Sequence, residues 1–295
     1  MESLRPPLLQ SPEYARTLDA LGLPLRRGSL GPDSAPEASW LIQSRHMPLL
    51  GKVELLSRGP VLGTPLLPED WWPACRSPRG TPLLLNATGD APERLLAAGF
   101  WPLVTPATIA MLTLAPPETM RQAMHQKWRN RLNHSLDAGL GIRRMPLTPG
   151  HWLLEAEAAQ ARARRYRGLP PPLIAAFAQA NPGRALIWEA RCNDTPVAAI
   201  AILRHGPMAT WQIGVTPPEG RRRNAMNALL WDAMCWLAAH GHDRLDLGML
   251  NSDDAAGLTR FKLGTGARAE RLGGTWLHHP ALAPLARRLP KRLAA

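Results

Sequence analysis

The sequence predicts an α+β fold of two domains, each a mixed, mostly antiparallel sheet flanked by helices. Three strand-like runs follow one another over residues 185–191, 197–203 and 209–215. Asn193-Asp194 and His205-Gly206-Pro207 supply turns between them, so the three runs form an antiparallel meander. Helical patterns precede and follow this meander. The 295 residues suffice for roughly two domains, each with its own core.

The first half of the chain alternates strand and helix candidates without an internal repeat, which predicts a first domain over residues 1–140. The strand candidates lie at 40–43, 53–56, 83–85 and 107–114, and the helix candidates at 12–21 and 92–99. A long basic helix over 117–140 closes this half. The residues of its apolar stripe recur every four positions: Met120, Met124, Trp128, Leu132 and Leu136.

Another face of this helix carries Lys127, Arg129 and Arg131. A charged helix face is often only solvated. Guanidinium groups also pair bidentately with phosphate oxygens, so the same face can bind an anion. We take the three residues as candidate substrate contacts in a groove between the domains.

The second half predicts a domain over residues 141–280 and a basic tail over 281–295. Outside the meander, the strand candidates lie at 142–145, 244–247 and 267–277, and the helix candidates at 148–167, 173–180, 224–240 and 257–263. The tail combines apolar residues with arginines and a lysine. We expect it to be solvated, with peripheral contact to an anionic membrane as the alternative.

The chain is strongly basic. Lys and Arg number 35 against 23 Asp and Glu, so the net charge is 35 − 23 = +12. Such a surplus raises the local concentration of anionic partners, such as nucleic acid, a diphosphate ligand, coenzyme A or an anionic membrane. Charge alone does not choose among them.

Cysteine spacing and hydropathy indicate the cellular compartment of the protein. Cys75, Cys192 and Cys235 are widely spaced, and no C-x-x-C pair indicates a zinc site or a redox motif. Residues 1–14 lack the apolar segment of a secretory signal. The longest strand-like apolar run is too short to span a bilayer. We therefore expect a soluble, cytoplasmic protein without a metal.

One stretch near the end of the chain combines a strand, a polar turn and a short helix. The strand ends at Asp246 and Leu247, Gly248 follows, and the helix then brings Lys262 back beside the strand end. A carboxylate at a strand terminus with a lysine nearby is a common arrangement in catalytic sites. The alternative is a surface turn with an incidental lysine.

A candidate anion site precedes the helix over 224–240. Arg221, Arg222 and Arg223 come directly before Asn224, which we expect to cap that helix. Free amide hydrogens, the helix dipole and three arginines together suit a pyrophosphate or a tRNA backbone.

Four segments, in order, resemble the Fem-type peptidoglycan-bridge aminoacyltransferases of bacteria and their acetyltransferase-like relatives. The first two are Arg58-Gly59-Pro60-Val61 and Lys127-Trp128-Arg129-Asn130-Arg131. The third is the helix Leu229 to Gly241 followed by Leu245-Asp246-Leu247-Gly248, and the fourth is residues 257–266, GLTRFKLGTG. The last is the most specific, because it resembles the family's G-L-x-x-F-K-x-G-F-G. The resemblance implies two tandem domains of the general N-acetyltransferase (GNAT) superfamily, whose fold the order of elements in the second half also fits.

This resemblance implies an N-acyltransferase that moves an acetyl or aminoacyl group to an amine. Lys262 would stabilise the oxyanion, Phe261 would position Lys262, and Asp246 would accept the amine proton, orient Lys262 or only hold the strand end. Arg221, Arg222, Arg223 and Asn224 would bind the donor, and no cofactor would be tightly bound. The acceptor would be an amine, which the resemblance places in a cell-wall precursor.

The sequence also departs from the family. Thr265 replaces a usual aromatic residue, and Met249 replaces a frequent glycine. The helical arm associated with tRNA is absent, and so is the acetyl-CoA loop R/Q-x-x-G-x-G/A, of which residues 220–225 are a degenerate form. The donor therefore stays open between acyl-CoA and aminoacyl-tRNA. The alternative function is a non-catalytic protein of GNAT fold that binds RNA or another polyanion through a basic groove.

Overall fold

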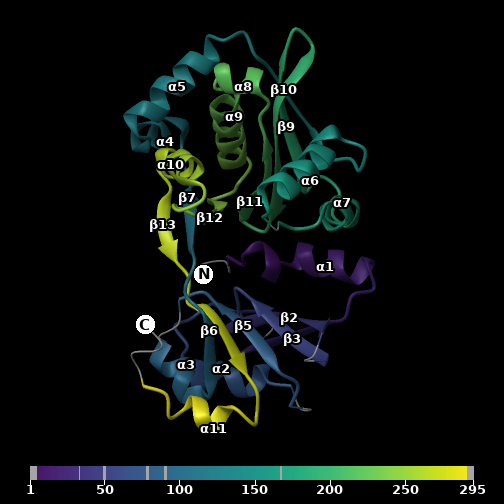
Figure 1. The fold of residues 1–295 in the computed structure, drawn as a ribbon, viewed down its shortest axis with the longest axis vertical. Coiled ribbons are helices and arrows are strands. Elements are labelled where there is room, and N and C mark those ends of the chain that lie inside the picture. The colour runs from purple at the N-terminus through teal and green to yellow at the C-terminus, as the bar shows by residue number, and fades with distance from the viewer. Residues whose placement is uncertain are drawn as a thin grey trace. The chain divides into compact units, whose positions relative to one another are not determined.

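The computed structural model describes residues 5–32, 34–48, 51–77, 80–89, 92–166 and 168–290. The chain divides into two compact units, Met1–Thr108 with Arg271–Ala295, and Ile109–Glu270. Each unit has its own sheet and its own core (Figure 1). The predicted α+β class, with two mixed sheets flanked by helices, is confirmed.

The first unit is built on a mixed sheet. Its strand order is β1-β2-β3-β5-β14-β6, and β4 pairs with β2. The strands are β1 (Leu25–Leu30), β2 (Ala38–Met47), β3 (Gly51–Ser57), β4 (Val61–Leu62), β5 (Leu83–Ala87), β6 (Phe100–Val104) and β14 (Gly274–His278). The helices are η1 (Leu8–Gln10), α1 (Pro12–Ala20), α2 (Pro68–Cys75), α3 (Pro92–Ala98) and α11 (Ala283–Ala286). Its core contains several aromatic residues, among them Trp71, Trp72, Phe100 and Trp276.

The second unit contains the predicted meander. Its strand order is β13-β7-β12-β11-β10-β9-β8. The strands are β7 (Thr108–Thr113), β8 (Gly141–Pro146), β9 (Ala185–Cys192), β10 (Thr195–His205), β11 (Met208–Val215), β12 (Arg244–Leu250) and β13 (Arg268–Arg271). The helices are α4 (Pro117–Ala123), α5 (Gln126–Leu136), α6 (Trp152–Arg164), α7 (Pro171–Ala180), α8 (Pro218–Arg222), α9 (Ala225–Ala239) and α10 (Ala256–Gly264). Strands β8 to β11 are antiparallel, and β11 pairs with β12 in parallel.

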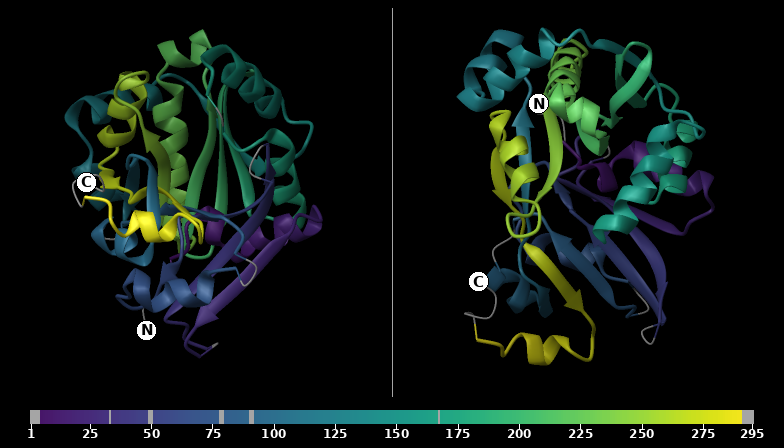
Figure 2. Two further views of the ribbon diagram at one scale, coloured as in Figure 1. Left: turned by 60° about the horizontal axis from the view of Figure 1, so that its bottom comes forward. Right: turned by 45° about the horizontal axis from the view of Figure 1, so that its top comes forward.

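Helices cover both faces of this second sheet. Helices α5 and α9 lie on one side of it, and α6 and α7 lie on the other (Figures 1 and 2). Apolar side chains of α5 and α9 share one core with the strands, including Trp128, Trp188 and Leu229. The face of α6 that carries Leu153 and Leu154 is also buried.

The helix predicted over 117–140 is two helices. Met124 has an extended backbone between α4 and α5, and the His125 amide donates to the Gly264 carbonyl at 3.0 Å. This tertiary hydrogen bond replaces one that a continuous helix would form. The apolar stripe is otherwise as predicted, because Met120, Met124, Trp128 and Leu132 are buried. Leu136, at the end of α5, is 54 % exposed.

The compact units differ from the predicted domains 1–140, 141–280 and 281–295. Helices α4 and α5 belong to the second unit, because their apolar stripe packs into the core of the meander. The single strand predicted over 267–277 is two strands, β13 and β14, which belong to different sheets. Leu272 and Gly273 separate them, and Gly274, the first residue of β14, has a φ of +86°.

Helix and strand bounds elsewhere shift by a few residues. The helix predicted over 148–167 begins later, at Trp152, and ends at Arg164, while Arg167 lies outside the described residues. Of the predicted tail, 281–290 is described and contains α11, and 291–295 lies outside the described residues. The strand β1 and the helix α2, within a proline-rich stretch, were not predicted.

Packing of α10 on α5 gives a first prediction. A Cβ at Gly264 would lie 2.7 Å from Cδ1 of Trp128, whose side chain is 3 % exposed and cannot move aside. We expect Gly264→Ala to lower the free energy of unfolding by about 1–3 kcal/mol, the usual cost of overpacking a core. Urea unfolding followed by circular dichroism measures this difference.

Gly257 on the same helix is the matched control. A Cβ there would meet no atom within 4 Å. Gly257→Ala should therefore leave stability unchanged or raise it slightly, because alanine favours the helix by about 0.5–1 kcal/mol. Equal effects of the two substitutions would show that the contact between Gly264 and Trp128 does not limit packing.

Candidate functional site

The parallel pairing of β11 and β12 stops well before either strand ends. Residues Met208–Thr210 pair with Arg244–Asp246, whereas β11 continues to Val215 and β12 to Leu250. The register of β11 on β10 also skips Gln212, which marks a β-bulge. A bulge bends its strand and increases the local twist. The two strands therefore diverge, and one edge of β11 after Thr210 pairs with no described strand.

Lys262 lies beside this divergence. Its Nζ donates to the Met249 carbonyl at 2.7 Å, and Nζ is 6.0 Å from the centroid of the Trp211 ring. The side chain is buried, with 7 % exposed. Burial lowers the pKa of Lys262 to about 8, against the opposing attraction of Asp246. Lys262 and Asp246, which the sequence predicts to lie close together, therefore interact electrostatically, and their catalytic roles stay predictions.

Asp246 has a structural partner in its own turn. Its Oδ1 accepts from the Gly248 amide at 2.7 Å, and the carboxylate is 2 % exposed. Gly248 has a φ of +79°, a conformation that favours glycine. Asp246 therefore fixes the backbone of β12 just beyond the residues that pair with β11 and, through its charge, favours the protonated form of Lys262.

Phe261 lies between two tryptophans. Its ring centroid is 5.8 Å from that of Trp128 and 6.0 Å from that of Trp211. These contacts join α10 to α5 and to β11, so they fix the helix from which Lys262 extends. The expected positioning role of Phe261 is consistent with these contacts.

The segment before α9 differs from the sequence interpretation. Asn224 has a left-handed backbone with φ +50°, and its side chain makes no capping hydrogen bond to α9. Its Nδ2 instead donates to His134 Nδ1 at 3.1 Å. The prediction of an Asn224 cap was wrong, because the short helix α8 precedes α9 and the left-handed turn between them directs Asn224 elsewhere.

The three arginines of this segment have different partners. Arg221 Nε donates to the Thr216 carbonyl at 3.1 Å. Arg222 and Arg223 both pair with Glu219, and Arg223 also donates to the Ala138 carbonyl at 2.9 Å. Glu219 therefore neutralises part of the predicted anion site. Arg221 and Arg222 are the two with exposed side chains.

Of the predicted substrate contacts on α5, Arg129 has a local role. Its Nη1 donates to the carbonyls of Gln122 and Met124 at 3.2 and 3.0 Å, at the end of α4. Lys127 and Arg131 are exposed on the same helix. Two of the three predicted residues are thus available to a ligand without breaking a described contact.

Sequence reasoning missed a buried carboxylate on α6. Glu157 is 9 % exposed, and its Oε1 accepts from the Tyr166 hydroxyl at 2.8 Å. Gln160 donates to Glu157 Oε2 and to the Gly214 carbonyl of β11, each at 3.3 Å. Burial raises the pKa of Glu157, against the hydrogen bonds from Tyr166 and Gln160. The available signal was its spacing of four residues from the apolar Leu153, which puts both on one helix face.

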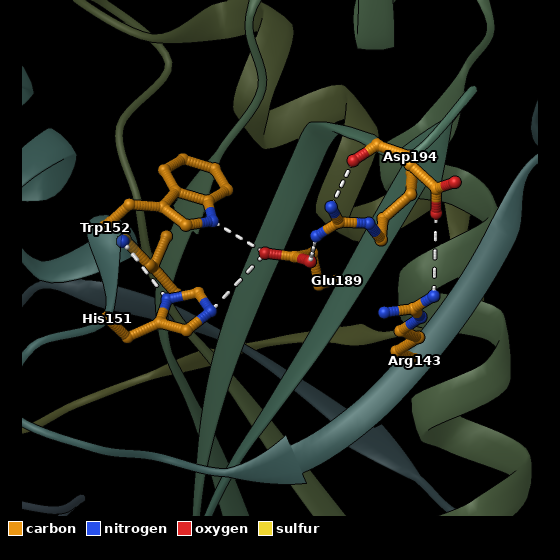
Figure 3. Close-up of polar contacts among 7 residues, drawn as sticks. Arg143, His151, Trp152, Glu189 and Asp194 are labelled. Atoms are coloured by element: carbon orange, nitrogen blue, oxygen red, sulfur yellow. Dashed lines mark hydrogen bonds and ion pairs between the residues drawn. The ribbon is translucent and has the colours of Figure 1, made fainter.

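A second missed group anchors the start of α6 to β9 (Figure 3). Glu189 accepts from Trp152 Nε1 and Arg191 Nη1, each at 2.6 Å, and lies 3.4 Å from His151 Nε2. Burial opposes the charge of Glu189, but these hydrogen bonds hold its pKa below the usual value. His151 Nδ1 accepts from the Leu153 amide at 3.2 Å, which caps α6. This cluster positions the helix that carries Glu157.

No group of three His, Cys, Asp or Glu side chains in the described ranges could hold a metal ion. The Nε2 atom of His242 accepts a hydrogen bond from Arg204 Nε at 2.9 Å. Among the described residues, no helix is both long and apolar enough to cross a membrane.

Residues 151–269 match the family of the acetyltransferase (GNAT) domain. This range contains the diverging strands, Lys262 and Glu157. No match was found among curated protein sequences.

Solved structures resemble the whole chain. FemX shares 14 % identity with a TM-score of 0.75, over 95 % of this chain and 93 % of FemX. The C-terminal domain of a putative lysylphosphatidylglycerol synthetase from Agrobacterium fabrum shares 15 % identity with a TM-score of 0.54, over 95 % and 91 % of the chains. A tandem GNAT protein from the clavulanic acid biosynthesis pathway shares 12 % identity with a TM-score of 0.54, over 94 % and 89 %. At these identities the likeness shows the fold.

The burial of Lys262 predicts a pH dependence of stability. Its pKa falls from 10.5 in an exposed lysine to about 8 in the folded protein. The unfolded chain therefore binds this proton more tightly, and the free energy of unfolding should rise as the pH increases from about 8 to 10.5. Lys262→Met removes this titration. We expect the stability of the variant relative to wild type to be highest near pH 7 and to fall across that range.

Chemical denaturation of both proteins at several pH values measures the difference. The lost hydrogen bond to Met249 lowers the variant's stability by a similar amount wherever that bond is present, so the slope with pH is the informative quantity. A difference that stays constant between pH 7 and 10.5 would contradict the lowered pKa. Arg268→Gln, an exposed substitution on β13, should show no such slope relative to wild type.

Proposed function

We propose that the chain, whose residues 151–269 match the GNAT domain and whose fold resembles that of FemX, is an N-acyltransferase that uses an acyl-CoA donor. The observation that carries this proposal is the divergence of β11 and β12 beside a buried, cationic Lys262. The divergence exposes one edge of β11 to a ligand. Lys262 supplies a positive charge at that edge.

The reaction needs few groups from the protein. The acceptor amine attacks the thioester carbonyl and an oxyanion forms; the C–S bond then breaks, and the leaving thiolate takes up the proton that the amine nitrogen loses, which gives the amide and free thiol. Backbone amides of β11 after Thr210 and the Lys262 ammonium are suited to stabilise the oxyanion. With a pKa of about 8, Lys262 is mostly protonated at pH 7. We therefore assign it the role of a cation rather than that of a base.

The start of α9 is the proposed site of the donor's pyrophosphate. Helix N-termini bind anions through free amide hydrogens and the helix dipole. Arg221 and Arg222 are exposed there, and we assign them to the pyrophosphate. The family match of the second unit favours acyl-CoA, and the comparisons give no support to a charged tRNA as donor.

The sequence departure in this loop has a packing reason. A Cβ at Gly220 would lie 2.0 Å from the Val197 carbonyl oxygen. Glycine is therefore required for α8 to pack on β10. Gly220 thus retains one glycine of the acetyl-CoA loop pattern, and this glycine lets the backbone approach the sheet. The arginines that follow Gly220 supply positive charge.

For the acceptor we propose an amine of a cell-wall precursor, as the Fem resemblance implies. Lys127 and Arg131 on α5 would contact its anionic groups, and Arg129 would support them by holding the end of α4. We place the reaction in the cytoplasm. Membrane contact by the tail remains a prediction.

Substitution of Lys262 tests the role in chemistry. Lys262→Gln should leave the affinity for acetyl-CoA within about twofold of wild type and lower kcat by about 10²–10³, the usual effect of removing one donor to an oxyanion. Calorimetric titration with acetyl-CoA and release of free thiol in the presence of amine acceptors measure the two quantities. Arg268→Gln is the matched control and should leave both unchanged.

The pH profile supplies a second measurement. Wild-type kcat should decline above about pH 8 as Lys262 loses its proton. Lys262→Arg keeps a cation at all accessible pH values, so it should move this decline to higher pH. Unchanged turnover in Lys262→Gln would exclude the assigned role. Failure of wild-type protein to bind acetyl-CoA, together with salt-sensitive RNA binding, would favour the non-catalytic alternative.

A further inference from the structure

A second group of cations lies in the Ile109–Glu270 unit, at the end of the sheet where β11 and β12 are still paired. Arg144 belongs to the edge strand β8, Arg184 directly precedes β9, and Arg204 lies near the end of β10. We call these three residues the arginine cluster. Arg144 and Arg204 contact Trp236 near the C-terminal end of α9, whereas the proposed donor site lies at the start of that helix.

Trp236 of α9 holds two of these arginines in place. Its ring centroid is 4.4 Å from the guanidinium carbon of Arg144 and 4.9 Å from that of Arg204. The His240 ring stacks on Trp236 with centroids 3.8 Å apart and an interplanar angle of 21°. Cation–π contacts of this kind restrict the guanidinium groups without removing their hydrogen-bond donors.

The charge of the cluster is not cancelled by its neighbours. Arg204 donates through Nε to His242 Nε2 at 2.9 Å and through Nη1 to the Gly183 carbonyl at 3.0 Å. Burial lowers the pKa of His242 to about 4, and the charges of Arg204 and Arg184 act in the same direction. His242 is therefore a neutral acceptor at physiological pH. Both described partners of Arg204 leave its charge intact.

The carboxylate of α9 near this cluster forms its hydrogen bond with another residue. Asp232, one turn before Trp236 on α9, accepts from Trp188 Nε1 at 2.7 Å. Within the described ranges, no Asp or Glu forms an ion pair with Arg144, Arg184 or Arg204. Burial lowers the pKa of Arg204, and the charges of Arg184 and Arg144 lower it further. Three like charges thus lie within electrostatic range of one another, and no carboxylate in the described part of the chain forms an ion pair with them.

We propose that the arginine cluster is a binding site for the phosphate groups of a small phosphorylated ligand. A guanidinium group matches phosphate oxygens bidentately, and a multivalent anion would relieve the repulsion among the three arginines. Arg144 is exposed, and its guanidinium has no described hydrogen bond. His240 and the two guanidinium groups already cover Trp236, so the site recognises phosphate rather than a stacked base. It does not depend on the proposed acyl transfer.

Titration with inorganic pyrophosphate at low salt tests this site on the full chain. Arg144→Gln should weaken pyrophosphate binding about tenfold, as expected for the loss of a charged hydrogen-bonding partner, and Arg144→Gln/Arg204→Gln should weaken it further. The control is Arg162→Gln/Arg268→Gln, which removes the same charge from exposed positions of the same unit and should bind pyrophosphate as wild type does.

Each outcome separates the site from general electrostatics. Equal weakening in the control double variant would overturn the proposal, because charge alone would then explain binding. Weakening by Arg221→Gln with no effect of Arg144→Gln would place the anion at the start of α9 and would also overturn it. Binding to anionic phospholipid vesicles or to an RNA oligonucleotide without binding of pyrophosphate would do the same. Arg144 lies on an exposed edge strand, so the single variant keeps the test valid if the double variant unfolds.

Discussion

The incomplete pairing of β11 and β12 is the constraint on which the candidate site depends. Both strands lie in the middle of a sheet, where an unpaired edge leaves backbone amides and carbonyls without partners. The bulge at Gln212 bends β11, and the left-handed backbone of Gly248 interrupts the extended course of β12. Side chains then satisfy groups that a full ladder would have satisfied. Lys262 binds the Met249 carbonyl, and Asp246 binds the Gly248 amide.

Glycine next to large side chains allows the elements around this opening to approach one another. A Cβ at Gly214 would lie 2.7 Å from Trp211, which folds back along β11 and donates from Nε1 to the Ile213 carbonyl at 2.7 Å. Gly220 approaches the backbone of β10 in the same way. Trp211 in turn contacts Phe261 and Lys262. Close packing at Gly214 therefore helps to hold Trp211, which contacts the cation of the site.

Local patterns in the sequence predict the meander, the helix that follows it and the strand–turn–helix segment that carries Lys262. These features depend on turn residues and periodicity within a few tens of positions, which is why they could be found. The interruption at Met124 could not be found in this way, because it depends on a hydrogen bond from His125 to the distant Gly264. The separation of β13 from β14 likewise could not be found, because it depends on each strand pairing in a different sheet.

The candidate site shows the same limit. Lys262 and Asp246 were predicted together because the motif places them 16 residues apart across a single turn and helix. Glu157 was not predicted, because its burial depends on α6 packing against β11, and the sequence shows only an acid in an alanine-rich helix. Asn224 has the composition of a cap, but its left-handed backbone directs the amide to His134. The residue type predicts which local structure a residue favours, and the packing of the neighbouring helix or strand determines which contacts its side chain makes.

Net charge is a poor guide to where this chain binds anions. The surplus of +12 includes arginines that are paired with carboxylates, such as Arg26 with Glu54, Arg191 with Glu189 and Arg223 with Glu219. Such pairs contribute little field to a ligand at a distance. Arginines without a carboxylate partner contribute more to anion binding. Arg204 is one of them, because its described partner His242 is a neutral hydrogen-bond acceptor. Which basic segments can bind an anion therefore depends on whether nearby carboxylates neutralise them, and only the fold reveals this. The total charge is for the same reason a weak argument for an extended polyanion as partner.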